Sequence, residues 1–254
     1  MKLATLILCG ASLVFSLPAT AQAPLIPDES WSLDVGLNYV TGDFGFEQDT
    51  DVWLQVTTIH FESQPLHIQA SIPFVSISGP ASVIGTVGRP STGRERGLGD
   101  ASFAATYKFT DTATGISDLD FTVRVKFPTA DEDKGLGTGE TDTNLEFNYH
   151  HSFRAFTPFA TLGYRFLGSS ATYPLEDGFY STAGIAAPID DRTVGGLALT
   201  WRERIVADAD HATEAMIFIS HQLDGRWKVQ GFALSGFTDA SPNFGAGGLV
   251  GYKF

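Results

Sequence analysis

The feature that most constrains the fold is a strict two-residue alternation that recurs along the chain. In Leu119–Phe127, every odd position is apolar and every even position is polar or charged. A strand places such residues on its two opposite faces, whereas a helix would scatter the charges among the apolar side chains. Leu66–Phe74, Ala101–Phe109 and Asn144–His150 repeat the pattern. The sequence therefore predicts an all-β protein.

Twelve segments fit this interpretation, although those rich in glycine alternate less regularly. They are Trp31–Thr41, Val52–Phe61, Leu66–Phe74, Ala101–Phe109, Leu119–Phe127, Asn144–His150, Phe156–Phe166, Phe179–Ala187, Val194–Arg202, Thr213–Leu223, Trp227–Phe237 and Phe244–Phe254. An even number of strands is expected for a bacterial single-chain barrel. The prediction is a transmembrane, antiparallel, up-and-down β-barrel of about twelve strands.

The connections between these segments alternate in length. Those after odd-numbered strands are mostly long, such as Gly42–Asp51, Ile77–Gly99 and Pro128–Thr143, and those after even-numbered strands are mostly short, such as Glu62–Pro65. Outer-membrane barrels have long external loops and short periplasmic turns. The pattern therefore predicts that the N- and C-termini both lie on the periplasmic side.

Aromatic residues gather at the predicted strand ends, as at Phe61, Phe127, Trp201 and Phe237. Amphipathic rings favour the two membrane interfaces, so the apolar face is expected to point toward lipid. A barrel of this width is too wide to be filled as a dry apolar core. The charged face is therefore expected to point into the lumen.

The N-terminus indicates export. A short positive start is followed by an apolar run to Leu17 and by the small-x-small sequence Ala19-Thr20-Ala21, so residues 1–21 are predicted to be a cleaved signal peptide. The only cysteine, Cys9, lies inside that peptide. We expect a short periplasmic lead at 22–30 and the barrel at 31–254, in the cell outer membrane.

Charge and hydropathy exclude two classes of protein. The chain has 16 Lys and Arg against 29 Asp and Glu, a net charge of −13, which disfavours nucleic acid as a partner. After the signal peptide, no run is long and apolar enough for a membrane-spanning helix. Outer-membrane lipid is the expected surrounding.

The last segment ends in alternate apolar residues, Val250, Tyr252 and Phe254, with phenylalanine at the terminus. This pattern looks like the signal that the bacterial barrel assembly machinery recognises. It predicts a partner during biogenesis and no activity.

Several glycine-rich motifs recur around the predicted strand ends, and Ser241–Gly245 leads into the final strand. The motif residues are Gly97, Gly99, Asp100, Lys126, Pro128, Thr129, Gly135, Gly137, Gly139 and Asp142. Their order and spacing resemble the "MetA-pathway of phenol degradation" family of outer-membrane proteins, which are often labelled transporters. Family members often have glycine where this chain has Ala130. The resemblance implies passage of aromatic or other small hydrophobic compounds.

Charged side chains on the predicted inner face are candidates for a lumen lining. They are Asp100, Lys108, Asp120, Arg124, Lys126, Glu146, His150, Arg165, Arg202 and Glu214. One hypothesis is that they select what passes. The alternative is that opposite charges pair across strands and close the lumen as a polar plug.

Catalytic and metal sites are not expected. His150 and Ser152 have the spacing to share a strand face, but the predicted topology makes them lumenal, and no Gly-x-Ser-x-Gly elbow is present. The acidic run Asp131–Asp133, with Glu140 and Asp142, lacks the calcium-loop pattern of an EF-hand and is interpreted as a solvated loop. No cofactor or metal follows from the sequence, and we predict that the chain is not an enzyme.

Two functions remain open. The barrel is either a passive channel or transporter for small solutes, or a non-conducting structural or receptor barrel with Ile77–Gly99 as its main exposed loop. A soluble periplasmic β-protein is a third and weaker alternative. The identity of the solute does not follow from the sequence.

Overall fold

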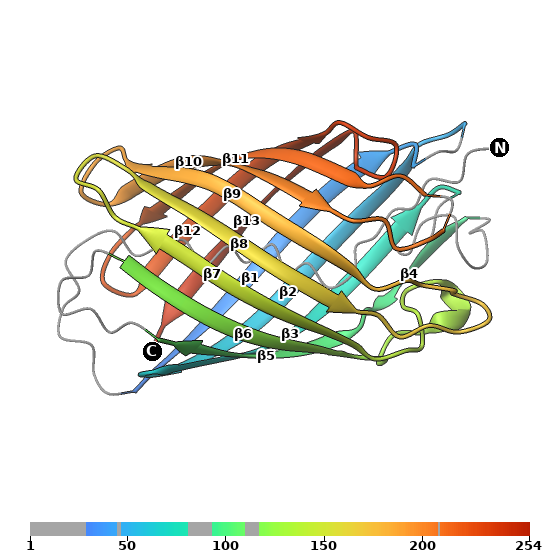
Figure 1. Cartoon of the computed structure of the whole chain (residues 1–254), viewed down its shortest axis with the longest axis horizontal. Coiled ribbons are helices and arrows are strands. Elements are labelled where there is room, and N and C mark those ends of the chain that lie inside the picture. Colours follow the sequence, from blue (N-terminus) through green and yellow to red (C-terminus); the bar gives the residue numbers. More distant parts are fainter. Residues whose placement is uncertain (1–28, 45–46, 81–92, 110–116, 208) are drawn as a thin grey trace.

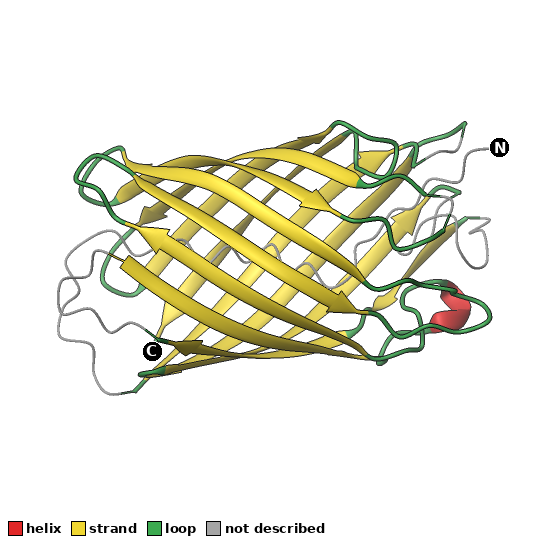
Figure 2. Ribbon diagram, viewed as in Figure 1, coloured by secondary structure: helices red, strands yellow, loops and turns green. Residues whose placement is uncertain are grey.

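The computed structural model describes residues 29–44, 47–80, 93–109, 117–207 and 209–254, which form one antiparallel barrel (Figure 1). The strands are β1 (Ser30–Gly42), β2 (Thr50–Ser63), β3 (Leu66–Ser78), β4 (Arg94–Leu98), β5 (Ala101–Lys108), β6 (Ser117–Phe127), β7 (Asp142–His151), β8 (Thr157–Phe166), β9 (Gly178–Pro188), β10 (Thr193–Arg202), β11 (Ala212–Gln222), β12 (Trp227–Gly236) and β13 (Phe244–Lys253). A single 3-10 turn, η1 (Glu132–Lys134), follows β6. Figure 2 shows the strands tilted around the barrel axis, as closure of a sheet requires.

The barrel has twelve wall positions, although thirteen strands build it. Strands pair in chain order, β1 pairs with β13, and β2 pairs with β3, so the described sheet is closed. β4 and β5 occupy one position, because both pair with β3: Phe74–Ser78 pairs with β4, and Leu66–Ser71 pairs with β5. The predicted fold class and strand number are therefore confirmed.

Both described chain ends lie at the same end of the barrel, which we call the terminal end. Phe254 N donates a hydrogen bond to Trp31 O at 3.0 Å. The opposite end, the loop end, has the longer connections, to the right in Figure 2. Connections at the loop end are 43–49, 79–93, 128–141, 167–177, 203–211 and 237–243; those at the terminal end are 64–65, 109–116, 152–156, 189–192 and 223–226. The predicted alternation of long and short connections is present.

The outer surface is apolar, with aromatic residues near both ends. Leu119, Phe127 and Phe147 of the cleanest alternating strands are all exposed on it. Ring pairs lie at the terminal end, such as Trp227 with Tyr252 at 4.7 Å. Others lie at the loop end: Tyr39 with Trp53, and Tyr164 with Phe166 and Phe179. The strand-end aromatics therefore form the two expected bands.

The structure corrects one connection. Ile77–Gly99 was predicted to be a loop throughout, but β3 continues to Ser78 and β4 forms before Gly99. The short, charged β4 sequence gives no apolar alternation, which is why the pattern missed it. The signal peptide 1–21 and residues 22–28 of the lead lie outside the described residues. Within the described part, no helix is long and apolar enough to cross a membrane.

Candidate functional site

The inner wall has a polar sector in which charged and hydroxyl side chains of neighbouring strands face one another. One row of register partners runs through it from β12 to β7: Lys228, Gly251, Asp34, Thr58, Ser71, Ser102, Lys126 and Asp142. Thr58 and Ser71 share a 2.9 Å hydrogen bond between their hydroxyl groups. The sequence predicted this polar inner face on β3, β5, β6 and β7.

Opposite charges pair across strands in this sector. Arg124 Nε of β6 lies 3.6 Å from Glu146 Oε1 of β7, and the guanidinium of Arg202 pairs with Glu214 on the neighbouring strand. The guanidinium of Arg124 also faces the amide of Gln69, which is possible because the small Ala104 lies between their strands. These contacts agree with the pairing alternative.

The other candidate lining residues have different surroundings. Arg165 donates to Glu203 O at 2.9 Å and lies over the Tyr180 ring, with 5.9 Å from its Cζ to the ring centroid. Lys108 and Asp120 are register partners on β5 and β6. His150 is the register partner of Phe159, at the edge of the polar sector. A selective role for any of these residues stays a prediction.

The lining residues predicted from the sequence do not include a second charged group, which lies at the terminal end. Asp34 Oδ2 lies 2.9 Å from Lys228 Nζ and 3.3 Å from His60 Nε2, and His60 Nδ1 lies 3.2 Å from His67 Nε2. Asp34 stands between Leu33 and Val35, so its alternation was visible in the sequence. Its partners come from β12 and β2, and strand order and register were needed to place them.

Another part of the inner wall is mainly apolar, contrary to the expectation of a charged lumen throughout. Inward-facing apolar residues and glycines form what we call the apolar band, which winds from the terminal end on β8 to the loop end on β3. In one row, successive register partners are Phe159, Gly184, Ala198, Met216, Leu234, Gly245, Val40, Val52 and Ile77. In the adjacent row they are Ala186, Gly196, Phe218, Phe232, Gly247, Asn38, Leu54 and Val75, and Asn38 is the one polar residue of the two rows.

Glycines make room for the aromatic rings of the band. Phe218 lies over Gly196, its register partner on β10. A Cβ added at Gly196 would meet the ring at Cζ, so the ring occupies the space that a side chain would need. Phe232 covers Gly247 in the same way, with 2.7 Å between that Cβ position and the ring Cε1. Each ring therefore lies against the neighbouring strand. This packing accounts for glycines that weakened the strand pattern in the sequence.

At the loop end the apolar band joins a cluster of buried side chains, which we call the mouth cluster. It consists of Val40, Phe44, Val52, Val75, Ile77, Leu136, Leu167, Tyr173, Leu175, Ile205 and Val206. The first five come from β1–β3 and the connection after β1, and the others come from connections after β6, β8 and β10. These groups belong to opposite sides of the ring of strands, so the cluster spans the barrel mouth.

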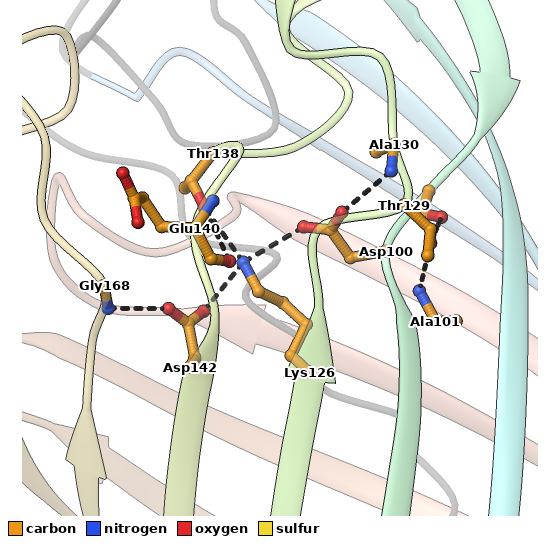
Figure 3. A network of polar contacts seen from close by, with 10 residues as sticks. Asp100, Ala101, Lys126, Thr129, Ala130, Thr138, Glu140, Asp142 and Gly168 are labelled. Atoms are coloured by element: carbon orange, nitrogen blue, oxygen red, sulfur yellow. Dashed lines mark hydrogen bonds and ion pairs between the residues drawn. The ribbon is translucent and has the colours of Figure 1, made fainter.

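Residues of the glycine-rich motifs converge on Lys126 near the loop end (Figure 3). Its Nζ lies 3.0 Å from Asp100 Oδ2, 2.9 Å from Asp142 Oδ2 and 3.0 Å from Thr138 Oγ1. Lys126 and the two carboxylates are almost completely buried. The other oxygen of Asp142 accepts a hydrogen bond from Gly168 N at 2.9 Å. Lys126 therefore ties strand β6 to Asp100 before β5, to the start of β7 and to the 128–141 connection.

Glycine is required at particular points around this node. A Cβ at Gly137 would lie 2.8 Å from both carboxylate oxygens of Asp100 and 2.7 Å from Ala130 Cβ. Gly135 and Gly139 have φ angles of 67° and 73°, which favour glycine. A Cβ at Gly97 would lie 2.8 Å from Leu136 Cδ1. These constraints fold the 128–141 connection inward, so that Leu136 reaches the mouth cluster.

The residues considered for catalysis and for metal binding have identifiable partners in the described part of the chain. The Ser152 hydroxyl accepts a hydrogen bond from Thr157 Oγ1 at 3.3 Å. Asp131 of the acidic loop pairs with Lys134 at 2.9 Å, which fits a solvated loop. No group of three or more histidine, cysteine or acidic side chains in the described ranges could hold a metal ion.

Solved structures with a similar architecture include channels and porins. An outer membrane channel from Pseudomonas putida F1 superposes with a TM-score of 0.70, 16% sequence identity and coverage of 92% of this chain and 100% of that chain. The NanC porin has a TM-score of 0.56, 10% identity and coverage of 87% and 98%. The KdgM porin has a TM-score of 0.54, 10% identity and coverage of 88% and 99%. At these identities the likeness shows the fold.

The sequence matches no protein of curated function. A family profile described as "Putative MetA-pathway of phenol degradation" matches residues 32–254, which include the whole described barrel except its first few residues. The motifs that meet at Lys126 are those that suggested this family from the sequence. The chain is an outer-membrane β-barrel and belongs to the phenol-degradation MetA-pathway family.

Proposed function

We propose that the barrel is a passive channel for small solutes that have an apolar or aromatic part. The observation that supports this proposal is the apolar band. Interiors of transmembrane barrels are usually polar, because their apolar face is turned toward lipid. Here Phe159 and Phe232 are inward-facing and only partly buried, so part of each ring faces the interior space.

The polar sector completes the proposal. A phenol or an aromatic acid has a ring that the band can contact and an oxygen that the hydroxyl and charged side chains of the opposite wall can bind. Ring–ring contact and hydrogen bonding each contribute modestly, which suits a solute that must also leave. We further propose that the loop end faces the exterior and the terminal end faces the periplasm.

The second candidate is a non-conducting structural or receptor barrel. The mouth cluster favours it, because Phe44 and Ile205 have no exposed surface and cover the interior along the axis. The two candidates differ in one measurable quantity, the rate at which a solute crosses a membrane that contains the purified protein.

The test is uptake of phenol and of benzoate by proteoliposomes, compared with protein-free liposomes. We expect the protein to accelerate benzoate uptake, because the charged acid crosses lipid slowly. Phe232→Gln should lower the rate by roughly tenfold, as expected for loss of an apolar contact, and Phe232→Leu should retain most of it. Uptake equal to that of protein-free liposomes would reject the channel in favour of the structural barrel.

The proposal includes no catalytic activity. The Ser152 hydroxyl is engaged by Thr157, and a nucleophile needs an orienting base within hydrogen-bond reach. The test compares phospholipid hydrolysis by the wild-type protein and by Ser152→Ala. A hydrolytic activity that the substitution abolishes would contradict the proposal.

A further inference from the structure

The barrel wall changes partners at one point on β3. Register pairing with β5 ends at Ser71 and Ser102, and pairing with β4 begins at Phe74 and Leu98. Between them, Gly99 N donates to Pro73 O at 2.9 Å. Proline has no N–H and cannot return a bond to the ladder. The backbone ladder is therefore interrupted at this level of the wall.

The interruption continues on the other side of β4. Pairing of β5 with β6 stops at Ala101 and Phe127, and within the described residues β4 pairs with β3 alone. The wall is closed here by contacts from the connection after β6, which Figure 3 shows. Thr129 Oγ1 accepts from Ala101 N at 2.8 Å and donates to Gly99 O at 3.1 Å.

Two further contacts complete this closure. Ala130 N donates to Asp100 Oδ1 at 3.0 Å, and the side chain of Leu136 lies against Gly97. We call this closure the seam. It consists of Gly97, Gly99 and Asp100 on one side and Thr129, Ala130 and Leu136 on the other. A single hydroxyl therefore bridges backbone groups that a continuous strand would pair.

The seam separates two apolar regions. On its inner side, Leu136 packs in the mouth cluster with Ile77, where the apolar band ends. On its outer side, Leu98, Phe74 and Phe127 are exposed on the barrel surface. The glycines of the seam have no side chains to thicken the wall. An apolar solute at the loop end of the band is thus separated from lipid by the seam residues alone.

Opening the seam would also disrupt fewer contacts than opening the mouth. Opening the mouth along the axis would expose Phe44 and Ile205, which have no exposed surface. Opening the seam would break the hydrogen bonds of Thr129 and Ala130 and expose Leu136, a single residue of the mouth cluster. We propose that uncharged apolar solutes pass between the barrel interior and the surrounding lipid through this seam. The inference rests on the proposed channel function and adds a route and a solute class to it.

A disulfide across the seam tests the proposal. Gly97→Cys with Leu136→Cys places sulfurs on the two sides, because a Cβ at Gly97 would lie 2.8 Å from Leu136 Cδ1. Cys9, the only native cysteine, precedes the barrel. The control pair is Thr182→Cys with Thr200→Cys, whose hydroxyls lie 3.0 Å apart on β9 and β10. It locks two strands that take no part in the seam.

The assay uses vesicles with lipopolysaccharide in their outer leaflet and measures two solutes. One is naphthalene, captured by cyclodextrin inside the vesicle, and the other is benzoate, which stays in water. With the seam disulfide formed, naphthalene delivery should fall to that of protein-free vesicles, and benzoate uptake should equal that of the same double-cysteine variant in its reduced form. A reductant should restore delivery, and the control pair should change neither rate. Thr129→Val, which cannot make the two hydroxyl bonds, should raise naphthalene delivery severalfold.

The outcomes separate the two proposals. Unchanged naphthalene delivery with the disulfide formed would overturn the seam and leave the channel intact. Loss of both solutes would also overturn it, because the lock would then be closing a shared axial route. A wild-type protein that transports neither solute would reject the channel itself. Heat-dependent gel mobility identifies any variant that fails to fold.

Discussion

Lys126 and Asp142 form a buried ion pair across β6 and β7, with 2.9 Å between Nζ and Oδ2, and Lys126 also binds Asp100. Replacing Lys126 with Met would leave two buried carboxylates without their cation. We expect a loss of about 3–5 kcal/mol in the free energy of unfolding, as for other broken buried pairs. Urea unfolding in detergent or lipid measures it.

The same connection offers a matched control. Lys134 pairs with Asp131 at 2.9 Å, but both side chains are about half exposed. Lys134→Met should therefore change the free energy of unfolding by about 1 kcal/mol or less. Equal losses from Lys126→Met and Lys134→Met would show that the buried node does not hold the loop end together.

Glycines beneath the band's aromatic rings should tolerate no side chain. Gly196→Ala brings a methyl group against the Phe218 ring and the Ile185 carbonyl, and overpacking of this kind costs about 1–3 kcal/mol. At Gly231 the nearest atoms to an added Cβ are 3.8 and 3.9 Å away, so Gly231→Ala should be close to neutral. Unfolding midpoints of the two variants compare them. A neutral Gly196→Ala would refute the ring-on-glycine packing.

The turn at 223–226 should contribute a pH dependence. Asp224 Oδ1 accepts from Arg226 N at 2.7 Å and Trp227 N at 2.8 Å, and these two backbone bonds hold the pKa of its carboxyl below the usual value. A lowered pKa stabilises the fold above the unfolded pKa of about 3.9, and this contribution is lost as pH falls through the folded pKa. As pH falls below about 5, the free energy of unfolding should therefore decrease less for Asp224→Asn than for the wild type. Equal decreases in the two proteins would contradict this prediction.

Orientation in the membrane can be measured with single cysteines. Lys134→Cys lies in an exposed loop-end connection and Gly225→Cys lies in a terminal-end turn, where an added Cβ meets nothing within 4 Å. In intact cells, a membrane-impermeant maleimide should label position 134 and not position 225. The reverse labelling would place the termini outside the cell and would reject the proposed orientation.

The sequence predicted the barrel well because transmembrane strands alternate between two distinct solvents. Phe121, Val123 and Val125 had to face outward once the charges between them faced inward, and loop length then set the common end of the termini. The same argument fails on β10, where Val194 and Ala198 face inward while Leu197 and Leu199 face outward. Both faces are apolar there, so alternation cannot reveal an apolar interior.

The sequence predicted which side chains face the interior better than it predicted which of them contact one another. Lys126 was placed on the inner face from alternation alone, but its partner Asp100 follows a strand break that β4 creates. Asp34 and Lys228 lie far apart in sequence and meet because β13, the strand between theirs, carries Gly251 at that register. Such pairs depend on register and on small residues between strands, which one sequence does not specify.

A closed barrel usually unfolds as a unit, because every strand has two neighbours to hold it. β4 has only β3 beside it among the described strands, and its outer edge depends on the contacts of one connection. Its amide hydrogens are therefore expected to exchange with solvent earlier than those of β3, without disruption of the ring. The barrel would then combine a permanent frame with one segment that opens by local unfolding.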